Sequence, residues 1–156
     1  MIKVSDLAGP DAILPKLKAA TKKQALQELA RFAAGLTGAS ETHIFDTLMK
    51  RERLGSTGLG QGVAIPHGKI EGLKRLQGVF ARLATPVDFD AVDDTPVDLV
   101  FLLLVPEHAG ADHLKALARI SRLLRDQALC DKLRGTDSAD AIYALLHEFE
   151  SAAFAA

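Results

Sequence analysis

The sequence predicts an α/β (α+β) fold, with a single domain over residues 1–156 and a mixed β-sheet flanked by helices on both faces. Helical periodicity comes first, strand-like apolar segments occupy the middle, and helical periodicity returns after Pro106. The segment 97–105, VDLVFLLLV, is almost continuously apolar, which is typical of a strand covered on both faces. The strands neither alternate regularly with helices nor all join as hairpins, so we expect parallel and antiparallel pairs in one sheet.

Two helices are predicted in the first third of the chain. Thr21, followed three residues later by Gln24, forms a capping-box pattern at the start of the first helix. A second helix is predicted to begin at Ser40 and to carry Arg51 in its last turn, where a cation suits the helix dipole. The positions expected to face the core are Ala25, Leu29, Phe32, Ala33 and Leu36 in the first helix and Ile44, Phe45, Leu48 and Met49 in the second.

Four segments of strand character follow one another, with a glycine-rich loop among them. The expected strands are Ala12–Leu14, Val63–Ile65, Leu76–Leu83 and Val97–Val105. Glycine appears four times between Gly55 and Gly62, so we expect a loop with unusual backbone turns there.

Three helices are predicted in the last third of the chain. Asp112 is the expected N-cap of the first, Ala128–Leu133 forms a short second helix that ends at Gly135, and Asp137 or Ser138 caps the last. The positions expected at helical spacing on the apolar faces are Leu114, Leu117, Ala118, Leu123 and Leu124 in the first and Ile142, Leu145, Leu146 and Phe149 in the last.

The composition excludes several classes of protein. The chain has 19 basic and 20 acidic residues and a net charge of −1, which argues against a dedicated nucleic-acid binder. Its one cysteine, Cys130, favours a reducing compartment. The first residues lack a signal-peptide pattern, and the longest apolar run, Leu99–Pro106, is too short to cross a bilayer. We therefore expect a cytoplasmic protein without membrane insertion.

The segment Gly55–Gly62 matches neither of the common nucleotide-binding motifs. No GK[ST] completes a Walker A motif, and Val63 stands where the dinucleotide fingerprint needs its third glycine. Loop composition alone favours a tight turn that joins a helix to a strand. The alternative is an anion site made by the backbone donors of Gly55, Ser56 and Thr57 with the two hydroxyls.

Two of the five histidines stand in positions that favour chemistry. His67 follows a strand-like segment, between Pro66, which fixes the backbone, and Gly68, which lets another molecule approach. An isolated histidine is often structural, but rigid loops at strand ends favour function. His113 falls in the first turn of a helix, where the dipole disfavours a protonated imidazole. No zinc motif occurs, and no metal site is expected. His43 and His147 are expected at the surface or as caps.

Convergence of the glycine loop, Arg51, His67 and His113 would assemble a neutral imidazole, a set of donors and a permanent positive charge. Phosphoryl transfer to nitrogen needs these parts, because the protein mainly positions groups and stabilises charge on the phosphoryl oxygens. With no nucleotide site and no cofactor expected, the phosphoryl donor would be another protein. For Arg51 and Arg53, a solvated helix end is an equally simple interpretation without that convergence.

The segment Arg51–Lys69, which contains GSTGLGQGVAIPHGK, closely resembles the active-site segment of the enzyme IIA components of the phosphoenolpyruvate-dependent phosphotransferase system. The matching branch is the fructose/mannitol type, and most closely its nitrogen-regulatory members. A second segment, Thr85–Asp126, is similar to that family's central strand, connecting loop and following helix. The resemblance covers nearly the whole chain and implies one IIA type-2 domain over residues 1–156, with a mixed sheet flanked by helices.

The resemblance also implies roles for individual residues and partners. It makes His67 the phosphorylated nucleophile, His113 the second active-site histidine and Arg51 the arginine that assists the phosphoryl group. It matches Ser56 and Thr57 to the family's loop beside that site, and Gly55 stays a phosphate-binding candidate through its backbone donor. It implies a histidine phosphocarrier protein as donor, and a transporter, kinase or other regulator controlled by phosphorylation-dependent binding. His108, in the loop before His113, departs from the family and is not expected to be catalytic.

Three other functions remain open at this stage. A free-standing IIA component could pass phosphate to the IIB domain of a fructose/mannitol-type sugar permease. A non-enzymatic module could bind a phosphorylated ligand in the glycine loop. A metal-dependent hydrolase would need ligands gathered from distant segments, with no cysteine pair to help. We favour the regulatory phosphotransferase, since the chain carries neither a membrane segment nor a linker to a permease domain.

Overall fold

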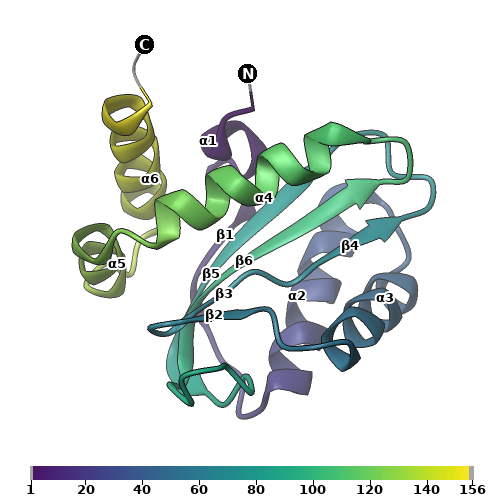
Figure 1. Ribbon diagram of the computed structural model, residues 1–156, viewed down its shortest axis with the longest axis horizontal. Coiled ribbons are helices and arrows are strands. Elements are labelled where there is room, and N and C mark those ends of the chain that lie inside the picture. Colours follow the sequence, from purple (N-terminus) through teal and green to yellow (C-terminus); the bar gives the residue numbers. More distant parts are fainter. Residues whose placement is uncertain (1, 155–156) are drawn as a thin grey trace.

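The computed structural model describes residues 2–154 and has one mixed six-stranded sheet between two helical layers, as predicted (Figure 1). The strands are β1 (Ile13–Leu17), β2 (Gly58–Gly60), β3 (Val63–Ala64), β4 (His67–Ile70), β5 (Gln77–Val87) and β6 (Val97–Pro106). The helices are α1 (Val4–Leu7), α2 (Lys22–Thr37), α3 (Glu41–Arg53), α4 (Ala111–Leu124), α5 (Gln127–Arg134) and α6 (Ala139–Ala153), with a 3₁₀ turn at Pro10–Ala12. Within the described residues, no helix is both long and apolar enough to cross a membrane.

Strand β6 organises the sheet. The strand order is β1-β5-β6-β3-β2, and β4 also pairs with β6. The β5–β6 and β2–β3 pairs are antiparallel, whereas β1–β5, β3–β6 and β4–β6 are parallel. Every residue of β6 except Asp98 is buried, which confirms the prediction of a strand covered on both faces.

Residues 63–70 run alongside β6 in two pieces, β3 and β4, separated by Ile65 and Pro66. Ala64 pairs with Val100 and His67 with Leu103. Between them the Leu103 N–H donates to the Pro66 carbonyl at 2.9 Å, but Pro66 has no N–H to return to the ladder. The sequence predicts His67 in a loop after a strand. That placement is wrong, because the chain rejoins the sheet at once and His67 begins β4.

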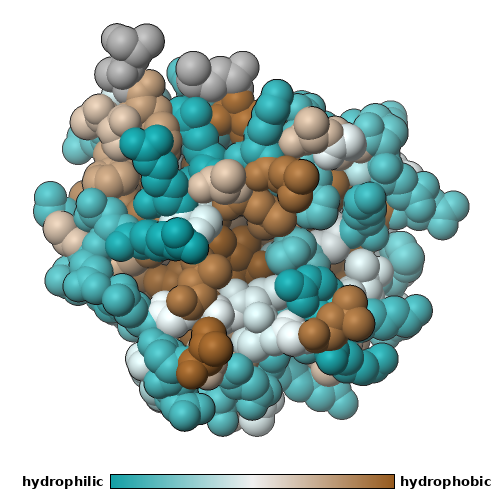
Figure 2. Space-filling view, viewed as in Figure 1, coloured by the Kyte–Doolittle hydropathy of each residue, from teal (hydrophilic) through white to brown (hydrophobic). Residues whose placement is uncertain are grey.

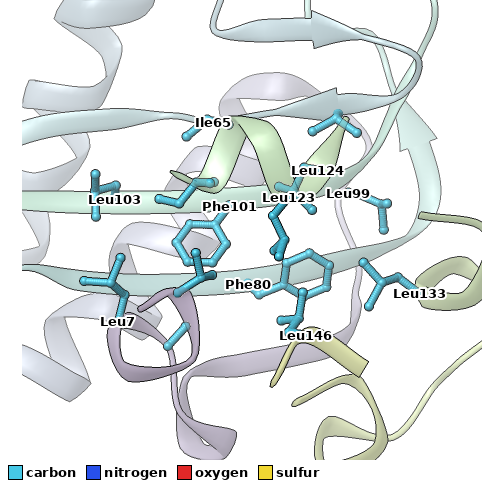
Figure 3. Packing of buried hydrophobic residues seen from close by; sticks show 14 of the residues in the cluster. Leu7, Ile65, Phe80, Leu99, Phe101, Leu103, Leu123, Leu124, Leu133 and Leu146 are labelled. Atoms are coloured by element: carbon cyan, nitrogen blue, oxygen red, sulfur yellow. The ribbon is translucent and has the colours of Figure 1, made fainter. Parts of the chain in front are cut away.

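The two faces of the sheet bury separate apolar clusters. On one face, α1, α4, α5 and α6 cover a cluster in which the rings of Phe80 and Phe101 lie 6.5 Å apart, with Leu123 and Leu146 packed beside them (Figure 3). On the other face, α2 and α3 cover the second cluster, which includes the fully buried Leu102. Helices on both faces were predicted, and the structure confirms them.

The helix caps follow the sequence signals with one shift. The Thr21 hydroxyl accepts from the Gln24 N–H at 3.1 Å, but the Gln24 side chain accepts from the Ala20 N–H rather than from that of Thr21. Ser40 caps α3 as predicted. Of the two candidates for the last helix, Ser138 is the cap, and its hydroxyl accepts from the Ala141 N–H. The three N-cap hydrogen bonds, at Thr21, Ser40 and Ser138, are thus confirmed, whereas the return bond of the capping box goes to Ala20 in place of Thr21.

Helix α4 differs from its prediction at its start and on its faces. It begins at Ala111 after Gly110, whose φ of +58° reverses the chain, so Asp112 lies inside the first turn and is not the N-cap. Leu114 and Ala118 are exposed, and Leu114 shows 70% of its surface. The buried positions are Ala116, Ile120, Leu123 and Leu124, so the prediction is confirmed for the last two leucines, and the half-buried Leu117 packs against the same core. The buried side is centred nearer Ala116 and Ile120 than the predicted set, which leaves Leu114 and Ala118 outside it.

The strand boundaries extend beyond the prediction at the edge of the sheet. Strand β1 starts at Ile13 and continues through Pro15 to Leu17, whereas Ala12 belongs to the 3₁₀ turn. A proline fits there because β1 is an edge strand, and a free edge needs no N–H from it. The glycine loop likewise contains the short strand β2, which the sequence did not reveal.

We predict that Leu102→Ala lowers the free energy of unfolding by about 2–5 kcal/mol, because it leaves a cavity in the cluster under α2 and α3. The matched variant Leu114→Ala, at an exposed position, is expected to change it by less than about 0.5 kcal/mol. Urea denaturation followed by circular dichroism measures both. Equal losses in the two variants would contradict the assignment of these faces.

Candidate active site

His67 lies where the chain rejoins the sheet, and its ring is oriented by the backbone just before it. The ring is half-buried, and Nδ1 lies 2.8 Å from the carbonyl oxygen of Ile65. A carbonyl can only accept a hydrogen bond, so Nδ1 carries the proton and donates it. The lone pair of the neutral ring is therefore on Nε2, and this atom is the one available as a nucleophile.

His113 meets His67 from the other side of the site. It stands in the first turn of α4, and the two rings lie edge to face, with centroids 5.8 Å apart and an interplanar angle of 61°. Nε2 of His113 is buried and has no hydrogen-bond partner among the described residues. A buried polar atom without a partner is costly, so this atom has hydrogen-bonding capacity left for a group that enters the site.

The surroundings keep both rings neutral. Burial lowers the pKa of His67, and the nearby charge of Arg51 lowers it further, whereas the hydrogen bond to Ile65 and the charge of Glu52 act in the opposite direction. For His113, burial lowers the pKa most, followed by repulsion from His67 and Lys69. Both imidazoles are thereby favoured as neutral donors or nucleophiles at neutral pH.

Arg51 reaches the site from the last turn of α3. Its Nη1 donates to the carbonyl oxygen of Gly55 at 2.9 Å. Gly55 has a φ of +147°, a conformation that side chains rarely adopt, and this turn helps to present its carbonyl to the guanidinium. The loop therefore anchors Arg51, and the charge of Arg51 acts on His67.

Glu52 is a residue of this region that the sequence analysis missed. Its buried carboxylate accepts from the Thr57 N–H at 3.1 Å and from the Thr57 hydroxyl at 2.5 Å, and it pairs with the Lys22 ammonium at 2.9 Å. A buried carboxylate is stable only with such partners. The sequence around Glu52 predicts a solvent-exposed charge at a helix end. Only the fold shows that its carboxylate is buried and holds the loop.

The hydroxyls of Ser56 and Thr57 are already engaged. The Ser56 hydroxyl donates to the Phe89 carbonyl at 2.6 Å and accepts from the Gly58 N–H at 3.0 Å. Thr57 donates to Glu52 as described above. The structure thus brings these residues beside Arg51, but their hydroxyls fold the loop onto its neighbours and are not free donors for an anion.

The turn between β2 and β3 is held from both sides by residues distant in the sequence. Gln61, with a φ of +57°, donates its N–H to the Asp93 carboxylate at 2.7 Å. Its carbonyl accepts from Nη2 of Arg134 at 2.8 Å, and Nε of Arg134 lies 2.9 Å from the carboxylate of Asp98. A Cβ at Gly62 would lie 2.6 Å from Nη2 of Arg134, so the glycine leaves space for the guanidinium that bonds to Gln61 and Asp98.

Gly68 has a packing role that the sequence did not reveal. A Cβ at this position would lie 2.7 Å from Cγ2 of Thr47 on α3. The missing side chain therefore lets α3 pack closely against β4. Because α3 carries Arg51, this close packing helps to bring the guanidinium toward His67.

The other histidines lie away from these contacts. His43 and His108 are exposed, and His147 stacks on Tyr143 with its Nδ1 3.4 Å from the Ser5 hydroxyl. Among residues 2–154, no three histidine, cysteine or acidic side chains gather as a metal site would require.

Exposed apolar side chains lie on the same elements as the site residues. Leu54, which follows α3, is 86% exposed, and Leu59 of β2 and Leu114 of α4 are exposed as well. Figure 2 shows apolar residues gathered in the hollow below α4 and at separate points beside the glycine-rich segment. Exposed apolar side chains around a polar site are typical of a protein-binding surface.

Comparison with known proteins places this site in a family. Residues 7–149 match the family described as "Phosphoenolpyruvate-dependent sugar phosphotransferase system, EIIA 2". The chain is 61% identical over 143 residues to a nitrogen regulatory protein of Bradyrhizobium diazoefficiens, covering 92% of this chain and 94% of the relative. It is 37% identical over 131 residues to a fructose-specific EIIA component of Haloferax volcanii, covering 83% and 84% of the two chains.

A solved structure gives the same result for the fold. The nitrogen regulatory protein IIA-Ntr of Neisseria meningitidis superposes with a TM-score of 0.86 at 37% identity, covering 92% of this chain and 98% of that one. The sheet with helices on both faces is thus the fold of a solved relative. By sequence and by structure, the chain belongs to the type-2 EIIA family of the phosphotransferase system, with relatives named nitrogen regulatory proteins and sugar EIIA components.

Proposed function

We propose that this protein is a regulatory phosphoryl carrier: His67 accepts a phosphoryl group from a histidine phosphocarrier protein, and the phosphorylation state controls binding to a target protein. One observation carries the proposal. The hydrogen bond from Nδ1 of His67 to Ile65 leaves the lone pair on Nε2, and the ring lies edge to face with that of His113, whose buried Nε2 has no partner among the described residues.

The transfer exchanges one nitrogen–phosphorus bond for another. The Nε2 lone pair of His67 attacks the phosphorus, and the donor's N–P bond breaks with its electron pair retained by the donor ring, which leaves as a neutral imidazole. His67 then carries the phosphoryl group on Nε2 and the proton on Nδ1, so its ring is positively charged. The Ile65 carbonyl stabilises that charge, because its hydrogen bond strengthens when the donor ring becomes cationic.

His113 and Arg51 are proposed to stabilise the phosphoryl oxygens. A protonated Nε2 of His113 can donate to one oxygen, and this bond would satisfy a buried atom that otherwise has no partner. The Arg51 guanidinium retains donors beyond the one that holds Gly55, and a guanidinium matches phosphoryl oxygens in geometry and charge. Gly55, Ser56 and Thr57 contribute by fixing the loop that positions Arg51.

The regulatory assignment rests on the relatives. The Bradyrhizobium protein, a nitrogen regulatory protein by name, shares far more identity with this chain than the Haloferax fructose component does. The Haloferax relative nevertheless supports a second candidate function, transfer of the phosphoryl group to the IIB domain of a fructose-type permease. We propose a cytoplasmic site of action, with residues 1–156 acting as one IIA type-2 domain and no cofactor required. Transfer from the phosphorylated chain to an isolated fructose-type IIB domain would favour the second function.

We predict that phosphoenolpyruvate and the two upstream phosphotransferase proteins label the chain with an acid-labile, alkali-stable phosphoryl group. His67→Ala should abolish the label, because it removes the nucleophilic Nε2. The matched variant His43→Ala, which removes an exposed histidine of α3, should keep it. Phosphate release at low pH and mass spectrometry of the labelled chain measure the outcome. An acid-stable label, or a label that persists in His67→Ala, would contradict the proposed function.

We predict that His113→Ala retains the fold but slows phosphoryl transfer about 10²- to 10³-fold, the effect of removing one donor to a developing oxyanion. His113→Gln, which restores an N–H donor, should recover part of the rate. Rapid-quench measurements of transfer to His67 determine the rates. Unchanged kinetics in His113→Ala would remove this residue from the mechanism.

We predict that His67 titrates below its usual pKa of 6.5, since burial and Arg51 both disfavour its protonated form. Arg51→Gln should raise the pKa of His67, whereas Lys50→Gln, at the exposed neighbouring position, should leave it nearly unchanged. Because the folded ring binds fewer protons than the unfolded one, its contribution to stability grows as pH rises to about 6.5. NMR titration of the ring protons measures the pKa, and a value above 6.5 would contradict the account.

A further inference from the structure

A cationic stripe runs along α4 on the side away from His113. Lys115, Arg119 and Arg122 follow one another at i, i+4 and i+7. At about 100° per residue they lie within about 60° of one another around the axis, and His113 lies about 160° from Lys115. The helix therefore separates the cations from the paired histidines.

The three cations surround a cavity with apolar walls. The cavity has a volume of about 390 Å³ and is lined by Lys115, Arg119 and Arg122 together with Ile2, Ala118 and Phe154. None of these described lining residues is acidic, although the whole chain has 20 acidic and 19 basic residues. Figure 2 shows strongly hydrophilic residues between α4 and α6.

Two of the guanidinium groups are held in place by neighbouring side chains. The guanidinium carbon of Arg119 lies 3.8 Å from the centroid of the Phe154 ring, and that of Arg122 lies 4.6 Å from it. Arg119 also lies 3.6 Å from the carboxylate of Glu150, which accepts from the Val4 and Ser5 N–H groups. Side chains that are already ordered lose less entropy when a partner binds.

We propose that this surface, the α4 cationic face (Lys115, Arg119, Arg122 and the cavity they line), docks an acidic helical segment of a partner protein. Carboxylates spaced at three and four residues would meet the exposed Lys115 and Arg122, which lie about 10 Å, or two turns, apart along the helix, while Arg119 stays paired with Glu150 between them. An apolar side chain of the segment would enter the cavity between Ile2, Ala118 and Phe154.

The same observations favour a protein partner over a polyanion. A nucleic acid needs a longer basic footprint and would be repelled by the remainder of a chain whose net charge is −1. The apolar walls and the aromatic ring give a protein side chain a place to anchor. Because the face lies opposite His113, the segment stays bound whether or not His67 carries a phosphoryl group, and the inference stands independently of the proposed function.

The test uses the unphosphorylated protein and a fluorescein-labelled synthetic peptide that forms a helix, with glutamates at three- and four-residue spacing and one central leucine. Fluorescence anisotropy at low salt should show saturable binding. Lys115→Glu/Arg122→Glu is expected to weaken it about tenfold or more, because two attractive contacts become repulsive. The matched pair Lys18→Glu/Lys23→Glu, with the same change in net charge at exposed positions outside the face, should weaken it less than about threefold.

Two further arms examine the cavity and the independence from His67. A peptide with serine in place of its leucine should bind several-fold more weakly, and phosphorylation of His67 should change the affinity for the original peptide by less than about twofold. Thermal denaturation of both variant pairs verifies that they are folded. The inference is overturned by absence of saturable binding, by equal losses in the two variant pairs, or by tighter binding of a single-stranded oligonucleotide or phosphatidylglycerol vesicles through the same residues.

Discussion

The break in the strand beside β6 is the constraint on which the site depends. Residues 63–70 follow β6 in register, but Pro66 brings no N–H to the ladder, so the pairing stops after Ala64 and resumes at His67. In this gap the Ile65 carbonyl accepts from Nδ1 of His67, and the side chain is fixed in one tautomer. The buried strand β6 thus gives the site a rigid support, and Pro66 makes the break at which the ring of His67 is oriented.

The remaining parts of the site are positioned by elements that meet around this break. Strand β6 continues into α4, which brings His113 to the face of His67, and α3 brings Arg51 by packing closely on β4 at Gly68. The glycine loop is held by hydrogen bonds to Glu52, and its turn at Gln61 is held by hydrogen bonds to Asp93 and Arg134. The Gly55 carbonyl accepts from Arg51, and the hydroxyls of the loop bond to Phe89 and Glu52, so the role that we propose for these residues is to position Arg51.

Much of this arrangement was predictable from local patterns in the sequence. The apolar run of β6, the caps at Ser40 and Ser138 and the isolated position of His67 are short-range signals, and the structure brings Arg51, His67 and His113 together as expected. What escaped prediction depends on contacts between distant segments.

The missed features share that cause. Strand β4 has too few residues for a periodic signal, and its existence follows from pairing with β6. Local composition does not indicate that Glu52 is buried. It also does not indicate the hydrogen bond from Arg134 to the carbonyl of Gln61, which joins residues 73 positions apart. On α4, the glycine with a positive φ precedes a helix start that the sequence placed one residue later, and tertiary packing buries Ala116 and Ile120 while it leaves the predicted Leu114 exposed.

The most direct test of the account is the identity of the phosphorylated nitrogen. Long-range ¹H–¹⁵N correlation and ³¹P coupling in the ¹⁵N-labelled, phosphorylated protein distinguish the two nitrogens of His67. The hydrogen bond from Nδ1 to Ile65 predicts phosphorus on Nε2, with the proton retained on Nδ1. Phosphorus on Nδ1, or on any residue other than His67, would contradict the central claim that the break at Pro66 selects the nucleophile.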